Sequence, residues 1–579
     1  MFSKERLEEI KKKRQAWEQG TLAKTMKRFG VAQSAEKFYT PADIQDHDFL
    51  NDVGFPGEYP YTSGAYAMSS PMEGLKMAAT GSLVRAGIYS GYGTAEDTRE
   101  YYKMIQAKGF PGGPNMAFDL PTQIGLDSDD LRARGEVGKV GVAVDSFADF
   151  ETIFEAFTGP RDIDKIASNF TVNATADHII AMYVTLADKR GIGRDKLRGT
   201  PQNDVLKEFV ARSTHIFPIK PSMRMARDSI VFCNKELPLL NTINICGYHI
   251  REAGATRDQC LAYTLSNGIA YVQLGIDAGL NVDEFVNRFA FLNFGGSMEI
   301  LKEIAMVRAA RRMWAKIMKE RFGAKDPRSW IMRLPNAVAS IGCSTTTAQR
   351  PLNNHTRAVL GGVASALAGG TPIAFPPYDE PLGLGWSMEA LQLSIDAMRI
   401  MAHEAKLTEV IDPFAGSYYM EAQTDEIEAK AWEIIKQIDE MGGAVAAIDK
   451  GWMQRAIAKS AHEHQQQIEK GQKVIVGLNA FLGEQELEVM PSRLVPDAYD
   501  PAKRAEAEER QLKRLAQMKK ERDNKALEAS LKRLEEVARD EKANVIYPMI
   551  ECVKAYATMG EMTKTLKKVF GEDNEYGML

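Results

Sequence analysis

Short apolar runs alternate with longer amphipathic segments between about residues 80 and 400, and this alternation limits the possible folds more than any other feature. The short runs have the length and composition of buried strands, whereas segments such as 148–157 and 297–322 have helical periodicity. Over this length the pattern predicts an α/β fold built on a (β/α)₈ TIM barrel. An open doubly wound sheet is the alternative. The predicted strands are 139–147, 169–175, 240–249, 337–347 and 369–380.

The sequence pattern divides the chain into three parts. Residues 1–65 contain a charged helix at 4–28 and then an extended arm rich in proline, glycine and aromatic residues. The barrel is expected at 66–400, and 401–579 form a helical C-terminal region with a charged helical stretch from 501 to about 543. The arm cannot form its own core, so it either wraps a neighbouring domain or subunit or lies as a surface strap.

The composition indicates a globular cytoplasmic enzyme. A net charge of −5 and the absence of a basic tail argue against a nucleic-acid partner. The five cysteines are odd in number and form no C-x-x-C pair, which argues against a disulfide framework or a zinc knuckle. The N-terminus lacks the apolar core of a signal peptide, and no apolar run is long enough to cross a bilayer.

Polar residues follow the predicted strands. In barrels the carboxyl ends of the strands carry the active site, so these positions are the first to consider for chemistry. They are Asp145, Asn173, His249, residues 344–347, Asp379 and Glu380.

Gln202, Arg212 and His249 form the strongest candidate set, because all three lie at the ends of elements within 199–255. An amide, a guanidinium and an imidazole suit the binding of a polar acyl group, including a carboxylate, beside a proton donor. A lone histidine is more often structural than catalytic. The position of His249 at a strand end, beside Tyr248, favours a functional role.

Other motifs give weaker signals. The Gly- and Tyr-rich segment 85–102 lacks G-x-G-x-x-G, and 135–141 lacks the spacing of a P-loop, so dinucleotide binding and a GTPase are weakly supported. Cys343 has no convincing local base and is interpreted as a small buried residue. Asp379 and Glu380 fit acid–base carboxylates, a contact to ribose hydroxyls or a helix cap equally well.

Several blocks of the sequence resemble the large chain of the methylmalonyl-CoA mutase family, which comprises the adenosylcobalamin-dependent acyl-CoA mutases. The blocks occur in the same order as in the family and cover nearly the whole chain. The resemblance implies a (β/α)₈ barrel whose bore admits the pantetheine arm of CoA, with the cobalamin across one mouth. It also implies an isomerase that performs a radical carbon-skeleton rearrangement. The blocks include FPGEYPYTSGAY, YSGYGTAEDT, MAFDLPTQIGLDSDD, AYTLSNGIAYVQLGIDAGLNVDEFVNRFAF, VRAARRMWAKIM, DPFAGSYYME and YPMIECVKAYATMGEMTKTLKKVFG.

The resemblance also implies roles for single residues. Tyr89 falls on a tyrosine wedged between the substrate and the adenosyl group, and His249, beside Tyr248, falls on the hydrogen-bond donor to the thioester carbonyl. Gln202 matches a neighbouring substrate contact, and Arg212 matches the partner of the free carboxylate. Tyr66, Thr171, Thr200 and Arg288 match CoA contacts, and Phe118, Ala211, Gly342 and Glu380 match positions that face the corrin or the adenosyl ribose.

The sequence departs from the family pattern around the acyl pocket. Gly87 stands where the family commonly has an arginine, the loop at 69–82 is longer than usual, and Phe289 and Ala290 replace a serine-containing run. We therefore expect a substituted malonyl-CoA/succinyl-CoA pair as substrate, such as benzylmalonyl-CoA and phenylsuccinyl-CoA. Methylmalonyl-CoA/succinyl-CoA is the second choice, and 2-hydroxyisobutyryl-CoA or another branched acyl-CoA is the third.

The family's cobalt-ligating motif, D-x-H-x-x-G, is a further departure, because here Asp177 directly precedes His178. We therefore expect adenosylcobalamin to be ligated through a separate small cobalamin-binding subunit, in a heterotetramer, and expect no metal ligand in this chain. A non-catalytic structural subunit is the alternative from another functional class. The presence of Tyr89, Gln202, Arg212 and His249 together argues against it.

Overall fold

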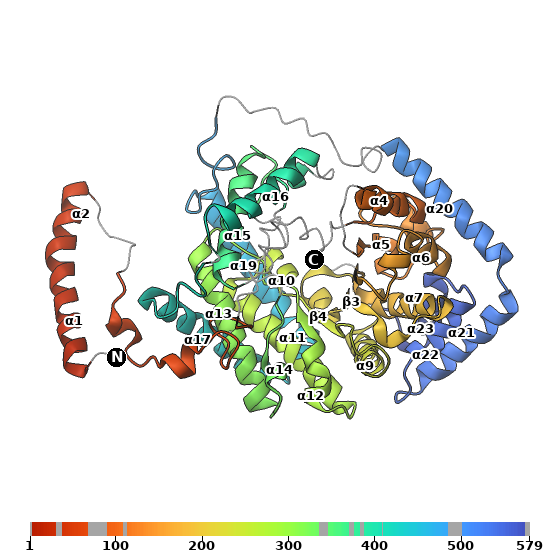
Figure 1. Ribbon diagram of the computed structural model, residues 1–579, viewed down its shortest axis with the longest axis horizontal. Coiled ribbons are helices and arrows are strands. Elements are labelled where there is room, and N and C mark those ends of the chain that lie inside the picture. Colours follow the sequence, from red (N-terminus) through yellow and green to blue (C-terminus); the bar gives the residue numbers. More distant parts are fainter. Residues whose placement is uncertain are drawn as a thin grey trace.

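The computed structural model shows an α/β protein that is mostly helical and contains small parallel sheets, as the alternating pattern predicts at this level (Figure 1). It describes residues 3–30, 38–67, 90–107, 113–334, 345–369, 376–382, 387–407, 409–483 and 501–573. Within these ranges, no helix combines the length and the apolar composition needed to span a membrane.

Five short strands in the described part of the chain run parallel to their neighbours. β1 (Asn115–Ala117), β2 (Ala167–Thr171) and β3 (Arg198–Gln202) form one sheet in that order. β4 (Ile243–Ile245) pairs with β5 (Phe289–Phe291) in a second sheet. Each strand is therefore paired with its sequence neighbour, as in consecutive β-α-β units.

Further backbone contacts join the two sheets and extend them. Gly199 in β3 bridges Leu240 in parallel, and the Asn241 amide donates to the Gly199 carbonyl at 3.0 Å. Beyond β5, the Phe291 amide donates to the Arg333 carbonyl at 2.9 Å. The strand order thus runs from β1 to β5, with the segment at 333 hydrogen-bonded beyond it, and the carboxyl ends of β1 to β5 face the same end of the molecule.

Helices lie between and around these strands, with π-helical turns at Glu18–Leu22, Phe49–Val53, Glu208–Arg212 and Ile317–Arg321. The α-helices are α1 (Lys4–Trp17), α2 (Ala23–Phe29), α4 (Ala95–Ala107), α5 (Leu120–Gln123), α6 (Phe147–Phe154), α7 (Ala176–Lys189), α8 (Val205–Lys207), α9 (Ile219–Glu236), α10 (Tyr248–Glu252), α11 (Arg257–Asp277), α12 (Val282–Phe285), α13 (Ile300–Lys316), α14 (Pro327–Trp330), α15 (Asn353–Leu367), α16 (Met388–His403), α17 (Tyr418–Glu440), α18 (Ala444–Asp449), α19 (Trp452–Glu469), α20 (Pro501–Glu521), α21 (Asn524–Arg539), α22 (Ile546–Lys554) and α23 (Met559–Phe570).

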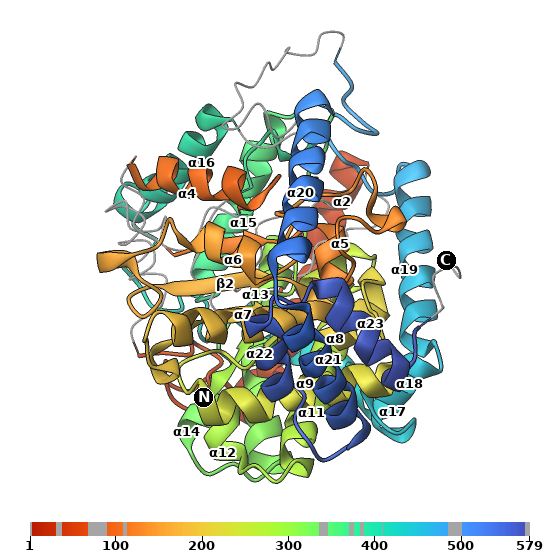
Figure 2. The same ribbon diagram turned by 90° about the vertical axis from the view of Figure 1, so that its right-hand side faces the viewer.

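Two large apolar clusters form most of the interior. One is built on β1, β2, α6 and α7 and includes side chains from α21, α22 and α23. The other is built on β4, β5, α11 and α13 and includes side chains from α17, α18 and α19. Figure 2 shows α20 to α23 lying over the face formed by α6, α7 and α9. The C-terminal helices therefore complete the apolar core around the strands.

The extended arm packs against its own chain through a buried arginine of α13. Arg311 donates from Nε to the Tyr61 carbonyl at 3.0 Å, from Nη2 to the Thr62 carbonyl at 2.7 Å and from Nη1 to the Ala368 carbonyl at 2.6 Å. Carbonyl oxygens thus satisfy a guanidinium that is only 3% exposed. This contact fixes the arm residues next to Tyr66.

The predicted N-terminal helix is present as α1, one π-helical turn and α2. These elements bury none of their side chains, and Figure 1 shows them standing away from the body of the molecule. An ion pair of 2.9 Å between Arg14 and Asp43 joins α1 to the arm.

The charged stretch predicted at 501–543 forms two helices, α20 and α21, with a break between them. Asp523 caps the second helix, because its side chain accepts hydrogen bonds from the Lys525 and Ala526 amides, both at 3.0 Å.

Candidate active site

The strongest candidate residues lie at the carboxyl ends of neighbouring strands. Gln202 is the last residue of β3 and is the register partner of Thr171, the last residue of β2. Asn173 follows β2 within two residues, and His249 lies on the short helix α10 that follows β4. Because parallel strands end at one edge, these side chains share a single face of the molecule.

Asp204 anchors the segment after β3 to the end of β4. As the N-cap of α8, its side chain accepts a hydrogen bond from the Lys207 amide at 3.2 Å. The same carboxyl group accepts from the Cys246 amide at 3.0 Å and from the Tyr271 hydroxyl at 2.7 Å. These contacts place the turn that carries Lys207 beside the residues that lead into α10.

Lys207 is the centre of a buried polar network. Its Nζ donates to Asn173 Oδ1 at 2.8 Å and to Gln202 Oε1 at 3.3 Å, and it forms an ion pair with Glu208. Asn173 in turn donates from Nδ2 to Gln123 Oε1 at 2.8 Å. The network links the ends of β2 and β3 to the π-helical turn Glu208–Arg212.

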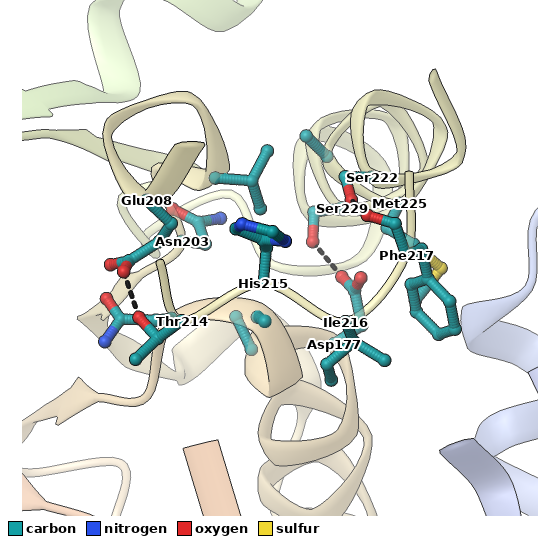
Figure 3. Close-up of a pocket in the computed structure, with 15 residues that line it drawn as sticks. Asp177, Asn203, Glu208, Thr214, His215, Ile216, Phe217, Ser222, Met225 and Ser229 are labelled. Carbon is teal, nitrogen blue, oxygen red and sulfur yellow. Dashed lines mark hydrogen bonds between the residues drawn. The ribbon is translucent and has the colours of Figure 1, made fainter. Parts of the chain in front are cut away.

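Arg212 ends this π-helical turn and faces the same carboxylate as Lys207. Its Nη1 lies 3.7 Å from Glu208 Oε1, and its side chain is 29% exposed. The Thr214 hydroxyl donates to the other oxygen of Glu208, as Figure 3 shows. One carboxylate therefore lies between two cations, of which the arginine alone reaches solvent.

His249 is partly buried beside these cations. Burial first, and then the charges of Lys207 and Arg212, hold the pKa of its imidazole well below the usual range. Its Nδ1 lies 3.3 Å from Cys246 Sγ. The Tyr248 ring lies 5.2 Å from the imidazole in an edge-on arrangement. His249 is therefore a neutral imidazole at ordinary pH, suited to donating a hydrogen bond.

Two of the predicted CoA contacts lie at the opposite end of the strands. Tyr66 and Arg288 line a pocket of about 430 Å³ together with Arg328 and Arg333. Arg288 immediately precedes β5, so the pocket opens at the amino ends of the strands. Burial and then the charges of Arg333 and Arg328 lower the pKa of Arg288. Three arginines and one glutamate, Glu284, line the pocket, so its net charge is positive and it fits an anionic group.

The other two predicted CoA contacts lie within the first sheet. Thr200, in the middle of β3, accepts a hydrogen bond from Asn241 Nδ2 at 2.7 Å. Asn241 Oδ1 accepts from Arg333 Nη1 at 2.9 Å, so Thr200 is joined to the cationic pocket. Thr171 ends β2 beside Gln202. The four residues are thus distributed between the two ends of the strands.

The predicted cofactor contacts have different environments. Phe118 is fully buried, with its ring centroid 6.3 Å from that of Phe170. Ala211 lies in the π-helical turn beside Arg212. Glu380 begins a short 3-10 turn and is exposed to solvent, with the carboxyl groups of Asp379 and Glu252 as charged neighbours. Glu252 ends α10, so Glu380 lies towards the same face as His249.

Several of the predicted positions lie outside the described residues: Tyr89, Gly342, Cys343 and Gly87. Asp145 lies within the described residues, and its carboxyl group is buried beside Asp149. The side-chain amide of Gln511 donates a hydrogen bond to the Asp145 carboxyl group at 2.7 Å. Burial and the charges of neighbouring aspartates raise the pKa of Asp145 well above its usual value. This group holds α20 against α6.

A narrow internal cavity of about 10 Å³ lies behind Glu208 (Figure 3). On its far side Ser229 donates to Asp177, and burial raises the pKa of that carboxyl to about 7. Burial lowers the pKa of the neighbouring His178 to about 3. The cavity is large enough for about one water molecule, so it is not a substrate pocket.

Lys207 and Glu208 are the main site residues that the sequence pattern did not single out. Both lie in the same stretch as Gln202 and Arg212. The available signal was a Lys-Glu pair between two candidate residues, but such pairs usually mark a solvated helix face. Their burial, at 0% exposure for each side chain, became visible only in the fold.

Comparison with known proteins gives a consistent result. The sequence model of the family described as methylmalonyl-CoA mutase matches residues 31–572. The chain is 39% identical to a protein of Aquincola tertiaricarbonis named 2-hydroxyisobutanoyl-CoA mutase large subunit, over 93% of this chain and 91% of that protein. It is 35% identical to methylmalonyl-CoA mutases of Rhizobium meliloti and Escherichia coli, over 92% and 93% of this chain and 71% and 72% of those proteins.

Proposed function

The chain belongs to the methylmalonyl-CoA mutase family, whose members are isomerases, and we propose that it rearranges the carbon skeleton of a carboxylated acyl-CoA. The observation that carries this proposal is the grouping of Gln202, Arg212 and His249 around Lys207 and Glu208 at one strand edge. These groups supply two hydrogen-bond donors for an acyl oxygen and a cation for a carboxylate.

The charges of the site favour a carboxylated substrate. Lys207 and Arg212 both lie beside Glu208, so one carboxylate serves two cations. A substrate carboxylate that binds Arg212 provides the second anion. An uncharged acyl group leaves a partly desolvated guanidinium without a full partner, which is unfavourable. The proposed substrate is a substituted malonyl-CoA/succinyl-CoA pair, such as benzylmalonyl-CoA and phenylsuccinyl-CoA, followed by methylmalonyl-CoA/succinyl-CoA.

In the proposed mechanism His249 donates a hydrogen bond to the thioester carbonyl. Burial raises the pKa of the Cys246 thiol to about 11, so the thiol keeps its proton and donates it towards Nδ1 of His249. The imidazole proton then lies on Nε2, which is the free donor. Gln202 contacts the same acyl group, and Tyr248 and the proposed Tyr89 exclude water from it. Tyr248 and Tyr89 therefore act by shielding reactive species from solvent.

Adenosylcobalamin is the general cofactor of this family and supplies the radical chemistry of the reaction when bound. Glu380 fits the adenosyl ribose, because an exposed carboxyl group on the face of His249 accepts hydrogen bonds from hydroxyl groups. Ala211 and the proposed Gly342 offer small side chains to the flat corrin. Phe118 fits this role least well, since its side chain is packed in the core.

The consecutive parallel strands support a closed (β/α)₈ barrel with CoA along its bore. The acyl site lies at the carboxyl ends of the strands, and the cationic pocket of Tyr66 and Arg288 lies at their amino ends. The CoA phosphates bind in this pocket, and Thr200 and Thr171 line the path between the two ends. In this proposal 66–400 bind the acyl-CoA, 1–65 form the arm, and 401–579 support the barrel.

A separate small cobalamin-binding subunit completes the enzyme in this proposal, giving a heterotetramer. The likeness to a protein named a large subunit, over 91% of its length, supports this arrangement. The same likeness supports 2-hydroxyisobutyryl-CoA as the third candidate substrate. Arg212 favours the carboxylated substrate instead.

An acyl-CoA panel assayed with and without a cobalamin-binding small subunit tests these proposals. We expect turnover only with the small subunit, and the highest kcat/KM with a carboxylated acyl-CoA. Arg212→Gln should lower kcat/KM for that substrate by about a hundredfold or more, because it removes a charge-assisted contact. Arg212→Lys keeps the charge and should retain more activity. A preference for 2-hydroxyisobutyryl-CoA that is unchanged in Arg212→Gln would overturn the substrate assignment.

A further inference from the structure

The buried ammonium of Lys207 is fully occupied by the protein. A lysine has three N–H donors, and here they face Asn173 Oδ1, Gln202 Oε1 and the carboxylate of Glu208. The side chain is 0% exposed, so no hydrogen remains for a substrate. Lys207 must therefore act through the residues that it contacts.

The contact with Gln202 determines which way the amide points. An amide carries an oxygen that only accepts and a nitrogen that only donates. Because the ammonium of Lys207 takes the oxygen of Gln202 at 3.3 Å, the NH₂ group is directed away from the lysine. Gln202 is thereby a donor for an acyl oxygen, and the opposite orientation would place two donors against each other.

The second contact of Lys207 is electrostatic and acts on His249. The charged and titratable groups that face this imidazole are Lys207 and Arg212 from the turn after β3, and Cys246 and Tyr248 from its own segment. Of these, the two cations disfavour the imidazolium, and the thiol is protonated. Glu208 faces the cations rather than the ring, so it neutralises part of their charge.

We propose that Lys207 is a positioning residue of the acyl site, which orients the Gln202 amide and keeps the His249 side chain an uncharged hydrogen-bond donor. This inference rests on the proposed function of the site. According to this inference, the reaction also requires a fixed positive charge that is buried behind the groups that touch the substrate. The arrangement is preorganised, because Lys207 is held by two hydrogen bonds and one ion pair before any substrate binds.

The test is a pH titration of His249 in the full chain, monitored by NMR of ¹³C-labelled histidine. The His249 resonance is assigned as the one that is lost in His249→Gln. Lys207→Met removes the charge at nearly constant side-chain length. We expect the midpoint of His249 to rise by about one pH unit or more, because removal of a nearby like charge has this effect. The control Lys220→Met removes an exposed lysine and should leave the midpoint unchanged.

Lys207→Gln also removes the charge and provides a second reading if Lys207→Met does not fold, because its amide can still donate to the surrounding acceptors. An unchanged His249 midpoint in either folded variant overturns the proposal. In the reconstituted enzyme, the acid limb of the kcat/KM profile should move to higher pH with Lys207→Met. If no acyl-CoA is turned over, the proposed function fails, whereas the NMR titration still decides the role of Lys207.

Discussion

His249 combines a strand-end position with a low pKa, and both features matter for a hydrogen-bond donor. The depressed pKa keeps the imidazole neutral, so its Nε2 hydrogen stays available without an imidazolium charge beside Arg212. The charge of Arg212 then remains free to bind an anion. In the proposed mechanism, these two neighbouring residues recognise different parts of one acyl group.

Replacing His249 with Ala should lower kcat by about a hundredfold or more, because one positioned donor to a reacting carbonyl is lost. The affinity for CoA and the melting temperature should change little, since the ring is only partly buried. Steady-state kinetics of the reconstituted enzyme measure the effect, with His462→Ala, an exposed histidine of α19, as the control. Normal turnover of the His249 variant would assign the ring a structural role.

Among single residues, the sequence predicts those whose side chains suit the chemistry better than it predicts charged residues that become buried. Gln202, Arg212 and His249 are recognisable because polar groups at the ends of elements are conspicuous, and the fold brings them together. Lys207 was not recognisable, because burial of a lysine depends on acceptors from distant segments, here Asn173 and Glu208. The catalytic roles themselves remain predictions.

Among the elements, the π-helical turn Glu208–Arg212 has the greatest effect on the site. Ser213, the residue that caps the turn at its C-terminal end, has a left-handed backbone conformation with a φ of +60°, and the chain therefore turns sharply after Arg212. No residue pattern distinguishes such a turn from an α-helix, because the wider hydrogen bonding is decided by packing. The strand predicted at 240–249 is longer than the observed β4, because the last residues of the predicted strand form the start of α10.

The contact between α7 and α9 contains a carboxyl group that opposes folding at neutral pH. The pKa of Asp177 is raised to about 7 in the folded state, against the ordinary value of 3.8. Between these values the folded state holds a proton that the unfolded state has lost, so stability falls as the pH rises through this window. His178 acts in the opposite direction between about 3 and 6.5, where only the unfolded state is protonated.

Asp177→Asn should therefore stabilise the protein by at least about 1 kcal/mol at pH 8, because it replaces a buried carboxylate by a neutral group that still accepts from Ser229. At pH 4 the gain should disappear. Thermal unfolding at the two pH values measures this. Asp188→Asn, on the same helix but exposed and paired with Arg194, is the control and should not stabilise. Equal effects of Asp177→Asn at both pH values would contradict the argument.

For the whole molecule, the sequence predicted the alternation of strands and helices but not the partners of the C-terminal helices. An amphipathic helix such as α21 shows that one face is buried, without showing what covers it. The fold assigns α21 to α23 to the cluster of β1 and β2, and α17 to α19 to that of β4 and β5. Segments far apart in sequence thus hold the strands whose ends form the proposed acyl site.

In the proposed function, the placement of two sites at opposite strand ends separates binding from chemistry. The pocket of Arg288, Arg328 and Arg333 is remote from His249, so its contacts should contribute equally to the ground state and the transition state. Arg288→Ala should therefore raise KM for the acyl-CoA about tenfold, as expected for loss of one charge-assisted contact, and leave kcat nearly unchanged. His249→Ala should show the reverse pattern.

Steady-state kinetics with the reconstituted enzyme, together with inhibition by free CoA, measure both effects. The inhibition constant of free CoA should rise in parallel with KM in Arg288→Ala, because CoA lacks the acyl group and reports on the pocket alone. Arg533→Ala removes an exposed arginine of α21 and controls for the loss of one positive charge. A fall in kcat with unchanged KM and unchanged CoA inhibition would place the CoA phosphates elsewhere. The proposed path of CoA from one end of the strands to the other would then be wrong.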